Sequence, residues 1–397
     1  MRCNRCSRTE SAIGRNTIER GTGDCSPVAQ FPSAPTGRMV CAMPTRRQPL
    51  ADADPDTLRN ECVAALRAGE LCVLPTETVY GLGCLPSDHR AVQKLRACKH
   101  RSERQPFTWH LADATDLDRL GARLPLPAER LIARYWPGPL TLILPGKDGG
   151  TIGARLPAHE FTRAVIRAAG EPLWLTSVND SGQPPLVEPD AIAARCADQG
   201  VALFVDDGPS PLGTASTIVR ATDGALEVLR EGILSRQEIL STAADLILFV
   251  CTGNTCRSPL AEAIAREATA QAMGVPVEQV LQRGLRFASA GTATVLGMPA
   301  SDGSAAAAAE IGLDLSAHQS QPIDPELLRQ AERIYCLSDS HRRALLAEAP
   351  DVADKVSLLR PDDRDIADPY GSDLPAYQRA RDEIRAAVAA RLGDWWP

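Results

Sequence analysis

The chain of 397 residues is long enough for two or three domains, and its composition, with 44% hydrophobic and 23% charged residues, is that of an ordinary soluble globular protein. A formal net charge of −7 argues against a protein that grips nucleic acid through a broad basic face, although small anions held in a pocket need no such face. No apolar run is long enough to cross a bilayer, and the 12 cysteines are scattered along the chain, so we expect a cytoplasmic protein with no membrane partner.

The first part of the chain lacks the periodicity of a folded domain. Residues 1–54 are rich in Arg, Ser, Thr, Pro and Gly, and we expect a disordered N-terminal extension there. Cys3 and Cys6 form an isolated C-x-x-C motif, whereas a zinc site needs two such pairs, and we predict no metal site. Met1 and Met43 are both candidate starts.

From residue 55 onward, apolar residues recur at helical and strand spacings. We predict a helix from Pro55 to Gly69 and a buried strand at 71–74 that runs into the loop Pro75-Thr76-Glu77-Thr78-Val79-Tyr80-Gly81-Leu82-Gly83. Further strands are expected at 107–111 and 173–179. A loop of hydroxyls and glycines after a buried strand is, alone, a weak indication of a ligand site.

Seven strings that follow one another along this part of the chain carry a resemblance to a known family. They are P-T-E-T-V-Y-G-L-G from Pro75, K-x-R at 99–101, W-P-G-P-L-T from Trp136, R-x-P-x-H at 155–159, S-x-N at 177–179, G-T-A-S-T-I-V from Gly213, and R-E-G at 230–232. Residues 55–234 thus resemble the YrdC-like family of L-threonylcarbamoyladenylate synthases. The resemblance implies a twisted mixed-sheet α/β domain and ATP-dependent condensation of L-threonine with bicarbonate, tRNA being reached only indirectly through a downstream transferase.

Eight residues of these strings, together with His110 of the expected strand 107–111, form the predicted substrate- and ATP-binding site: Thr76, Lys99, Arg101, His110, Arg155, Ser177, Asn179, Ser216 and Arg230. Release of pyrophosphate builds negative charge that Lys99, Arg101 and Arg230 could neutralise, with Mg²⁺ bridging the phosphate oxygens. Ser177 and Asn179 could hydrogen-bond adenylate or phosphate. Thr76, Arg155 and His110 could hold the amino acid.

Three departures from the family strings leave a second interpretation open. Ser102-Glu103-Arg104-Gln105-Pro106-Phe107 differs from the usual sequence after K-x-R, Val178 replaces the usual Ala, and Glu231 replaces the usual Pro. Because one fold can host several functions, a domain that binds nucleotide or RNA without catalysis is the alternative.

A short connection and a second α/β pattern follow. Ser235 to Leu240 predicts a helix with Ser235 at its N-cap, and we assign residues 235–244 as a linker. Residues 245–397 alternate strand-like runs at 246–250, 285–289, 333–337 and 355–359 with helix-like segments at 299–311, 325–331 and 374–392. This alternation predicts a doubly wound parallel four-stranded sheet.

The strongest functional signal lies at the end of the first of these strands. Leu246 to Val250 runs into Cys251 and a short loop, and a helix-like segment begins near Arg257. Backbone N–H groups and the positive end of a helix dipole around such a loop bind a tetrahedral oxyanion and favour a thiolate, which makes Cys251 a candidate nucleophile. Arg257 can offer two parallel N–H donors to a phosphoryl group. The predicted phosphate loop is completed by Thr252, Gly253, Asn254 and Cys256.

Two neighbours of the candidate nucleophile have open roles. Ser258 could cap the helix or donate its hydroxyl to the Cys251 sulfur. Cys256 could form a reversible disulfide with Cys251, or it could be a packed thiol.

The string C-x-x-x-x-x-R-S followed by P-L-A-E resembles the signature of the low-molecular-weight protein tyrosine phosphatase family. The resemblance implies a phosphocysteine intermediate on Cys251, a phosphoprotein substrate and no cofactor. It also implies a general acid in a D-P-Y loop, which here reads Asp368-Pro369-Tyr370.

Thr255 bears on the leaving group of the reaction. C-T-G-N-T-C-R-S-P is similar to the protein-arginine phosphatase branch, in which this threonine is understood to select phosphoarginine, whereas tyrosine-selective members have a bulky aliphatic residue there. A smaller side chain with a hydroxyl leaves room for a planar guanidinium. Since one pocket group seldom decides specificity, phosphoarginine and phosphotyrosine both remain candidates.

Overall fold

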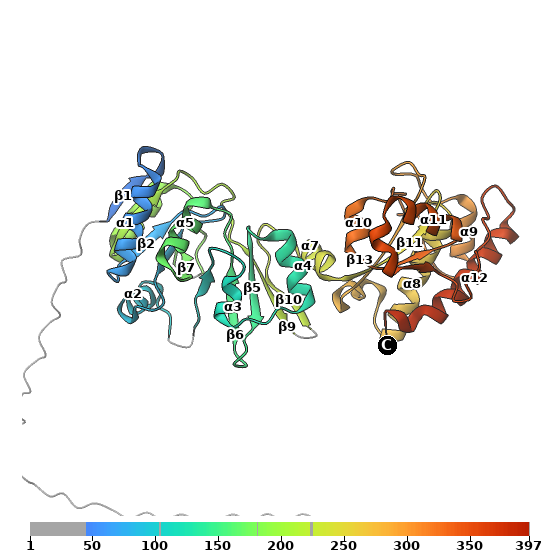
Figure 1. Cartoon of the computed structure of the whole chain (residues 1–397), viewed down its shortest axis with the longest axis horizontal. Coiled ribbons are helices and arrows are strands. Elements are labelled where there is room, and N and C mark those ends of the chain that lie inside the picture. Colours follow the sequence, from blue (N-terminus) through green and yellow to red (C-terminus); the bar gives the residue numbers. More distant parts are fainter. Residues whose placement is uncertain (1–44, 103–104, 181, 223–224, 397) are drawn as a thin grey trace, which may run out of the picture. The chain divides into compact units, whose positions relative to one another are not determined.

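The computed structural model describes residues 45–102, 105–180, 182–222 and 225–396, which form two separate β-sheets with their helices (Figure 1). The first sheet has ten strands and the second has four. Within the described ranges, no helix combines the length and the apolar character that a membrane crossing requires.

The first sheet and its helices take up residues 46–243. The strands are β1 (Arg46–Pro49), β2 (Leu71–Leu74), β3 (Gly81–Cys84), β4 (Thr108–His110), β5 (Leu140–Pro145), β6 (Thr151–Arg155), β7 (Leu173–Ser177), β8 (Val201–Asp206), β9 (Thr217–Thr222) and β10 (Ala225–Arg230). The helices are α1 (Pro55–Arg67), α2 (His89–Lys99), α3 (Asp116–Leu120), α4 (Leu126–Tyr135), α5 (Glu160–Ala169), α6 (Pro189–Gln199) and α7 (Arg236–Ala243).

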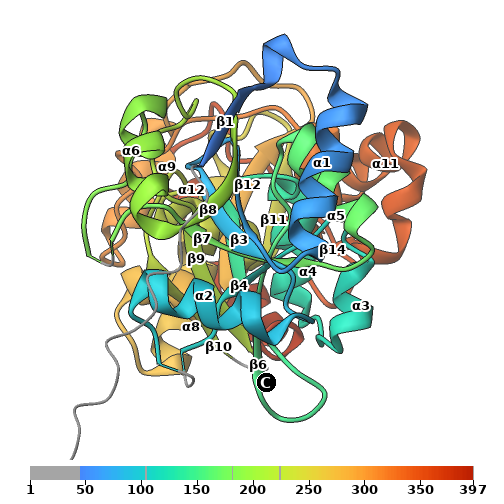
Figure 2. The same cartoon turned by 90° about the vertical axis from the view of Figure 1, so that its left-hand side faces the viewer.

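The strand order β1-β8-β2-β3-β7-β4-β6-β5-β9-β10 mixes parallel and antiparallel neighbours, which confirms the predicted mixed sheet. The fully buried strand β2 shows how helices cover both faces. Cys72 and Leu74 pack among residues of α1 and α5, which lie side by side in Figure 2, whereas Leu71 and Val73 pack among residues of α2 and α6. Since successive side chains of a strand point to opposite faces, an uninterrupted apolar run is what a strand between two helical layers requires.

The predicted disorder of residues 1–54 is wrong for residues 46–54, and residues 1–44 lie outside the described part of the chain. β1 pairs in parallel with β8 at the edge of the sheet, and the 3-10 turn Leu50–Asp52 follows it. Arg47 forms ion pairs with Asp190 at 2.6 Å and Asp206 at 2.8 Å. A strand held by long-range pairing leaves no periodic signal in its own short sequence, which explains the error.

The predicted linker 235–244 is also mostly structured. The helix expected to end at Leu240 continues to Ala243, and Ser235 and Glu238 form a complete capping box at its start. Ile239 and Ala243 are buried in the same apolar cluster as residues of α4 and β5. The segment is therefore part of the first domain's core.

The second sheet and its helices take up residues 245–396. The strands are β11 (Asp245–Cys251), β12 (Leu285–Gly291), β13 (Ala331–Cys336) and β14 (Val356–Leu358). The helices are α8 (Arg257–Met273), α9 (Asp302–Ala309), α10 (Pro325–Gln330), α11 (Asp339–Glu348) and α12 (Leu374–Arg391).

All four strands run parallel in the order β12-β11-β13-β14, which confirms the predicted doubly wound sheet. Ile247 and Phe249 of the central strand β11 face the core formed with α8 and α12, whereas Leu246, Leu248 and Val250 face the core formed with α10 and α11. The strand order reverses beside β11, and ligands of such sheets bind at the carboxyl end of the strands there. Cys251 is the residue at that end.

Candidate active sites

The loop between β11 and α8 is shaped by a buried asparagine. Asn254 is fully buried and has a φ of 53°, in the left-handed region that Asn tolerates better than most residues. Its Nδ2 donates to Ser258 Oγ and to Ser289 Oγ, both at 2.9 Å, and its Oδ1 accepts from the Gln321 backbone N–H at 2.8 Å. The three hydrogen bonds fix the loop against β12 and the segment before α10. Ser289, near the end of β12, thus helps to hold the loop in place.

Ser258 faces the candidate nucleophile. Its Oγ lies 3.0 Å from the Cys251 sulfur and accepts a hydrogen bond from Asn254, which leaves the hydroxyl proton available to the sulfur. The N-terminus of α8 has no side-chain cap. Of the two predicted roles, the structure therefore has Ser258 bonded to the sulfur rather than capping the helix.

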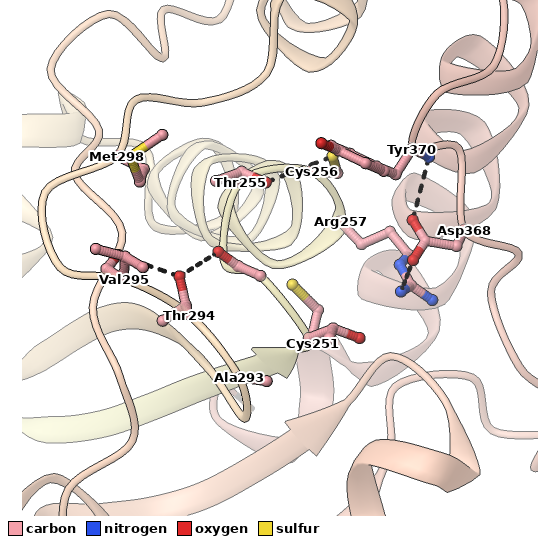
Figure 3. Close-up of a pocket in the computed structure, with 12 residues that line it drawn as sticks. Cys251, Thr255, Cys256, Arg257, Ala293, Thr294, Val295, Met298, Asp368 and Tyr370 are labelled. Carbon is pink, nitrogen blue, oxygen red and sulfur yellow. Dashed lines mark hydrogen bonds and ion pairs between the residues drawn. The ribbon is translucent and has the colours of Figure 1, made fainter.

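Arg257 and Asp368 meet beside Cys251, as Figure 3 shows. The Nη2 atom of Arg257 lies 2.5 Å from Asp368 Oδ2, and Nη1 donates to the Ile366 carbonyl at 3.0 Å. The buried Nε of Arg257 has no hydrogen-bond partner within the part of the chain that the structure describes. A buried donor without a partner costs free energy, and a phosphoryl oxygen is a suitable acceptor for it.

These residues line a cavity of about 630 Å³. Its walls are formed by Cys251, Thr252, Gly253, Thr255, Cys256, Arg257, Ala293, Thr294, Val295, Met298, Asp368 and Tyr370. Cys251 at its floor is 3% exposed, whereas Val295 and Tyr370 at its mouth are 71% and 74% exposed. A deep polar floor with an apolar mouth fits an anionic group carried on a larger molecule.

Thr255 and Cys256 of the predicted loop also lie on the cavity wall. Thr255 Oγ1 is 3.7 Å from the Cys256 sulfur, which in turn is 3.2 Å from Ser301 Oγ at the start of α9. All predicted loop residues except the buried Asn254 and Ser258 therefore face the cavity.

Sequence reasoning missed one group of this site. His341, in the first turn of α11, is buried, and its Nε2 lies 2.9 Å from Thr252 Oγ1. Burial, and next the nearby charge of Arg257, lower the pKa of His341 to about 4. Its place in the sequence, shortly after the end of the strand β13, could have indicated that it lies at the same edge of the sheet as Cys251.

The first domain has a smaller and more strongly cationic cavity, of about 150 Å³. Its lining comprises Thr76, Val79, Tyr80, Gly81, Arg101, Thr108, His110, Thr141, Arg155, Leu175, Thr176, Ser177, Ala215, Ser216, Ile218 and Arg230. Seven of the nine predicted residues are among them, and no carboxylate is. Three guanidinium groups and several hydroxyls around one cavity are chemically suited to bind an anion.

Contacts within the protein, namely an ion pair, a hydrogen bond and a ring contact, hold the three guanidinium groups in place. Arg155 pairs with Glu77 at 2.7 Å, Arg230 donates to the Ser216 carbonyl at 2.8 Å, and Arg101 stacks 4.9 Å above the Phe107 ring. Burial lowers the pKa of all three. A carboxylate partner for Arg155 was not foreseen, although Glu77 stands within the P-T-E-T string.

His110 is the neutral member of this site. Burial, and next the charge of Arg155, lower the pKa of His110 to about 3. Its Nδ1 lies 3.2 Å from the Thr108 carbonyl, so a neutral ring donates there and leaves Nε2 as an acceptor.

Lys99 and Asn179 lie beside the cavity rather than in its lining. Lys99 Nζ donates to the carbonyls of Ser177, at 2.9 Å, and Asn179. Burial, and next the charge of Arg101, lower the pKa of Lys99 to about 8. The Asn179 amide donates to the carbonyls of Asp180 and Gln183. Both side chains thus hold the end of β7, from which Ser177 reaches the cavity.

Fold and geometry together define a class, namely an α/β protein with an arginine-lined cavity in one domain and a cysteine–arginine loop at the carboxyl end of a parallel strand in the other. Residues 64–232 match the family model for Sua5, YciO and YrdC, described as telomere recombination, and residues 246–392 match the model described as low molecular weight phosphotyrosine protein phosphatase. The chain therefore belongs to the threonylcarbamoyl-AMP synthase family, with its Sua5/YrdC-type domain fused to a low-molecular-weight phosphatase domain.

Two curated relatives resemble the first domain. A threonylcarbamoyl-AMP synthase of Bacillus subtilis (strain 168) is 35% identical over 189 residues, which are 45% of this chain and 54% of the relative. A putative threonylcarbamoyl-AMP synthase of Mycobacterium tuberculosis (strain H37Rv) is 34% identical over 204 residues, which are 47% of this chain and 91% of the relative. The chain thus spans about half the length of the Bacillus relative.

Two solved structures resemble the second domain. A low-molecular-weight protein tyrosine phosphatase from T. tengcongensis is 32% identical, covers 38% of this chain and 99% of its own, and has a TM-score of 0.34. The YwlE arginine phosphatase from Geobacillus stearothermophilus is 30% identical. The match covers 38% of this chain and 92% of that one, with a TM-score of 0.33.

The burial of His110 predicts a pH dependence of stability. Its folded pKa of about 3 lies below the ordinary value of 6.5, so its contribution is fully present above pH 6.5 and is lost as the pH falls toward 3. Between pH 7.5 and pH 5 this loss amounts to about 2 kcal/mol. We expect His110→Gln to remove this part of the acid sensitivity, as measured by urea unfolding at both pH values.

The exposed His89, on α2 of the same domain, provides the control. His89→Gln should leave the acid sensitivity as it is in the parent chain. An equal sensitivity in the parent and His110→Gln proteins would show that His110 does not titrate as its burial requires.

Proposed function

We propose that the first domain synthesises L-threonylcarbamoyladenylate from L-threonine, bicarbonate and ATP. The observation that carries the proposal is the convergence of Arg101, Arg155 and Arg230 on one cavity that has no carboxylate in its lining. In this reaction the threonine carbamate attacks the α-phosphorus of ATP, and pyrophosphate leaves. Fixed guanidinium groups stabilise the charge that develops on the departing phosphates.

The residues of the cavity also fit the amino acid. The hydroxyl groups of Thr76 and Thr141 and the acceptor nitrogen of neutral His110 are suited to hold an ammonium group, while a guanidinium group holds the carboxylate. At about 150 Å³ the cavity is smaller than the pockets of drug-sized ligands, so it must widen to admit a whole nucleotide.

Mg²⁺ would reach this site with the phosphates of ATP. No group of three or more potential metal-ligating His, Cys, Asp or Glu side chains occurs within residues 45–102, 105–180, 182–222 and 225–396. The cavity therefore fits a metal bound mainly by the nucleotide, where the ion would add to the charge neutralisation that the arginines provide.

Pyrophosphate release from ATP tests this proposal. We expect release by the full chain to require threonine and bicarbonate, and Arg230→Met to reduce it at least tenfold, because a hydrogen bond to a charged group is lost. The control is Arg220→Met, an exposed arginine of the same sheet that pairs with Glu227. ATP binding without threonine-dependent release would favour a module that binds nucleotide without catalysis.

We propose that the second domain is a phosphatase that uses Cys251 as its nucleophile and acts on phosphoarginine or phosphotyrosine in proteins. The supporting observation is the placement of the Cys251 sulfur, the Ser258 hydroxyl and the Arg257 guanidinium around one buried floor. The thiolate attacks phosphorus, the loop N–H groups and Arg257 hold the equatorial oxygens, and the leaving group departs on the opposite side.

Asp368 is placed to supply the leaving group with a proton. Its carboxyl group is half-exposed at the cavity wall and pairs with Arg257. A bound phosphoryl group would compete for that guanidinium, and Asp368, freed from the ion pair, would take up a proton from solvent and face the leaving atom. The resulting carboxylate would then activate the water that hydrolyses the phosphocysteine, while Ser258 donates a hydrogen bond to the departing sulfur. A thiolate requires a reducing compartment, so we place the protein in the cytoplasm.

Release of phosphate from phosphoarginine and phosphotyrosine peptides tests this second proposal. We expect activity on at least one of them, and Cys251→Ser should abolish it because serine is a far poorer nucleophile at neutral pH. Cys336→Ser, in the buried strand β13 and outside the lining of the cavity, is the control variant. Full activity of Cys251→Ser would refute the assignment.

Thr255 should set the preference between the two peptides. We expect Thr255→Ile to shift the ratio of kcat/KM toward phosphotyrosine several-fold, since the larger side chain fills the space for a planar guanidinium. The parent chain is compared with the variant on both peptides under the same conditions. An unchanged ratio would rule out this role for Thr255.

A further inference from the structure

Thr252 on the cavity wall and the buried His341 behind it form a polar pair that has no part in the mechanism described so far. Thr252 Oγ1 lies 2.9 Å from His341 Nε2, and His341 Nδ1 lies 2.9 Å from Ser338 Oγ. Ser338 Oγ is in turn 2.7 Å from Ser340 Oγ. The four side chains form one hydrogen-bonded row that begins on the cavity wall and ends in the first turn of α11.

The position of Thr252 suggests which part of a substrate it meets. Cys251, which receives the phosphoryl group, is 3% exposed at the floor, whereas the next residue, Thr252, is exposed and lines the wall. The backbone N–H of Asp339, in the first turn of α11, donates to Asp365 Oδ1 at 2.7 Å, so the row lies next to the segment that carries Asp368. The side chain of Thr252 therefore lines the wall beyond the buried sulfur, where the leaving group of a substrate would lie.

The state of His341 decides what Thr252 offers there. His341 is 3% exposed, and the charged groups that act on it are Arg257 of α8 and Asp365 and Asp368 of the segment between β14 and α12. Its burial keeps it neutral at physiological pH. In the tautomer that carries its proton on Nδ1, His341 donates to Ser338, and Nε2 accepts the Thr252 hydroxyl proton. The lone pairs of Thr252 Oγ1 then face the cavity as an acceptor.

We propose that Thr252, oriented by His341, is a specificity-determining residue that accepts a hydrogen bond from an N–H group of a guanidinium leaving group and so favours phosphoarginine over phosphotyrosine. The proposal rests on the phosphatase activity proposed above and deepens it. A phosphoarginine leaving group carries N–H donors next to the scissile N–P bond. A phenol ring presents only C–H groups there and leaves the acceptor without a partner.

Competition between phosphoarginine and phosphotyrosine peptides with the full chain tests the proposal. Thr252→Val keeps the shape of the side chain but removes the acceptor, and we expect the phosphoarginine-to-phosphotyrosine ratio of kcat/KM to fall about three- to tenfold. Thr252→Ser, which keeps the hydroxyl, should restore the ratio to within about twofold of the parent.

His341 is tested as a positioning residue by the same ratio. His341→Phe removes both nitrogens and should lower the ratio as Thr252→Val does, whereas His341→Gln places an amide near Nε2 and should recover part of it. The double variant Thr252→Val/His341→Phe should lower the ratio no further than Thr252→Val alone, since both changes remove one interaction.

The outcomes separate the two levels of the proposal. An unchanged ratio in Thr252→Val, an equal loss on both peptides, or a parent chain that hydrolyses only phosphotyrosine would overturn the role of Thr252 while leaving the phosphatase in place. A parent chain that hydrolyses neither peptide would overturn both. If His341→Phe fails to fold, as judged by its thermal melt, the comparison of Thr252→Val with Thr252→Ser still decides.

Discussion

The second site depends on the hydrogen bonds of one buried amide. Asn254 turns the chain with a φ of 53° and ties the loop to Ser258, Ser289 and Gln321. Because Ser258 accepts from Asn254, its own proton is left to the Cys251 sulfur. The hydrogen bonds around the sulfur are thus formed before substrate arrives, so the proposed reaction would need little reorganisation of the loop.

The two proposed sites would bind anions by different physical means. The first would surround its ligand with guanidinium groups that are held by a carboxylate, by backbone carbonyls and by an aromatic ring. The second uses the N-terminus of α8, one guanidinium and a sulfur, and it leaves a wide apolar mouth for the rest of the substrate. A small cationic cavity suits positioning of a nucleotide's phosphates, and an open one suits a group carried on a protein.

Regular elements and contiguous motifs could be predicted from the sequence, whereas contacts between distant segments could not. The buried strand at 71–74 and the run from Leu246 to Cys251 have an apolar pattern that only a strand between two layers explains. The β1 strand went unrecognised because its pairing with β8 leaves no trace in four residues. Likewise, the pairing of Arg155 with Glu77 and of Thr252 with His341 depends on how loops meet at the sheet edges.

The central claim is that the Cys251 sulfur accepts the phosphoryl group, and mass spectrometry after rapid acid quenching tests it most directly. The full chain would be mixed with the phosphorylated peptide that it hydrolyses, and its proteolytic fragments would then be mapped for added phosphate. The account predicts phosphate on the fragment that contains Cys251, at that residue. Phosphate on another residue, or none anywhere while the peptide is being hydrolysed, would contradict it.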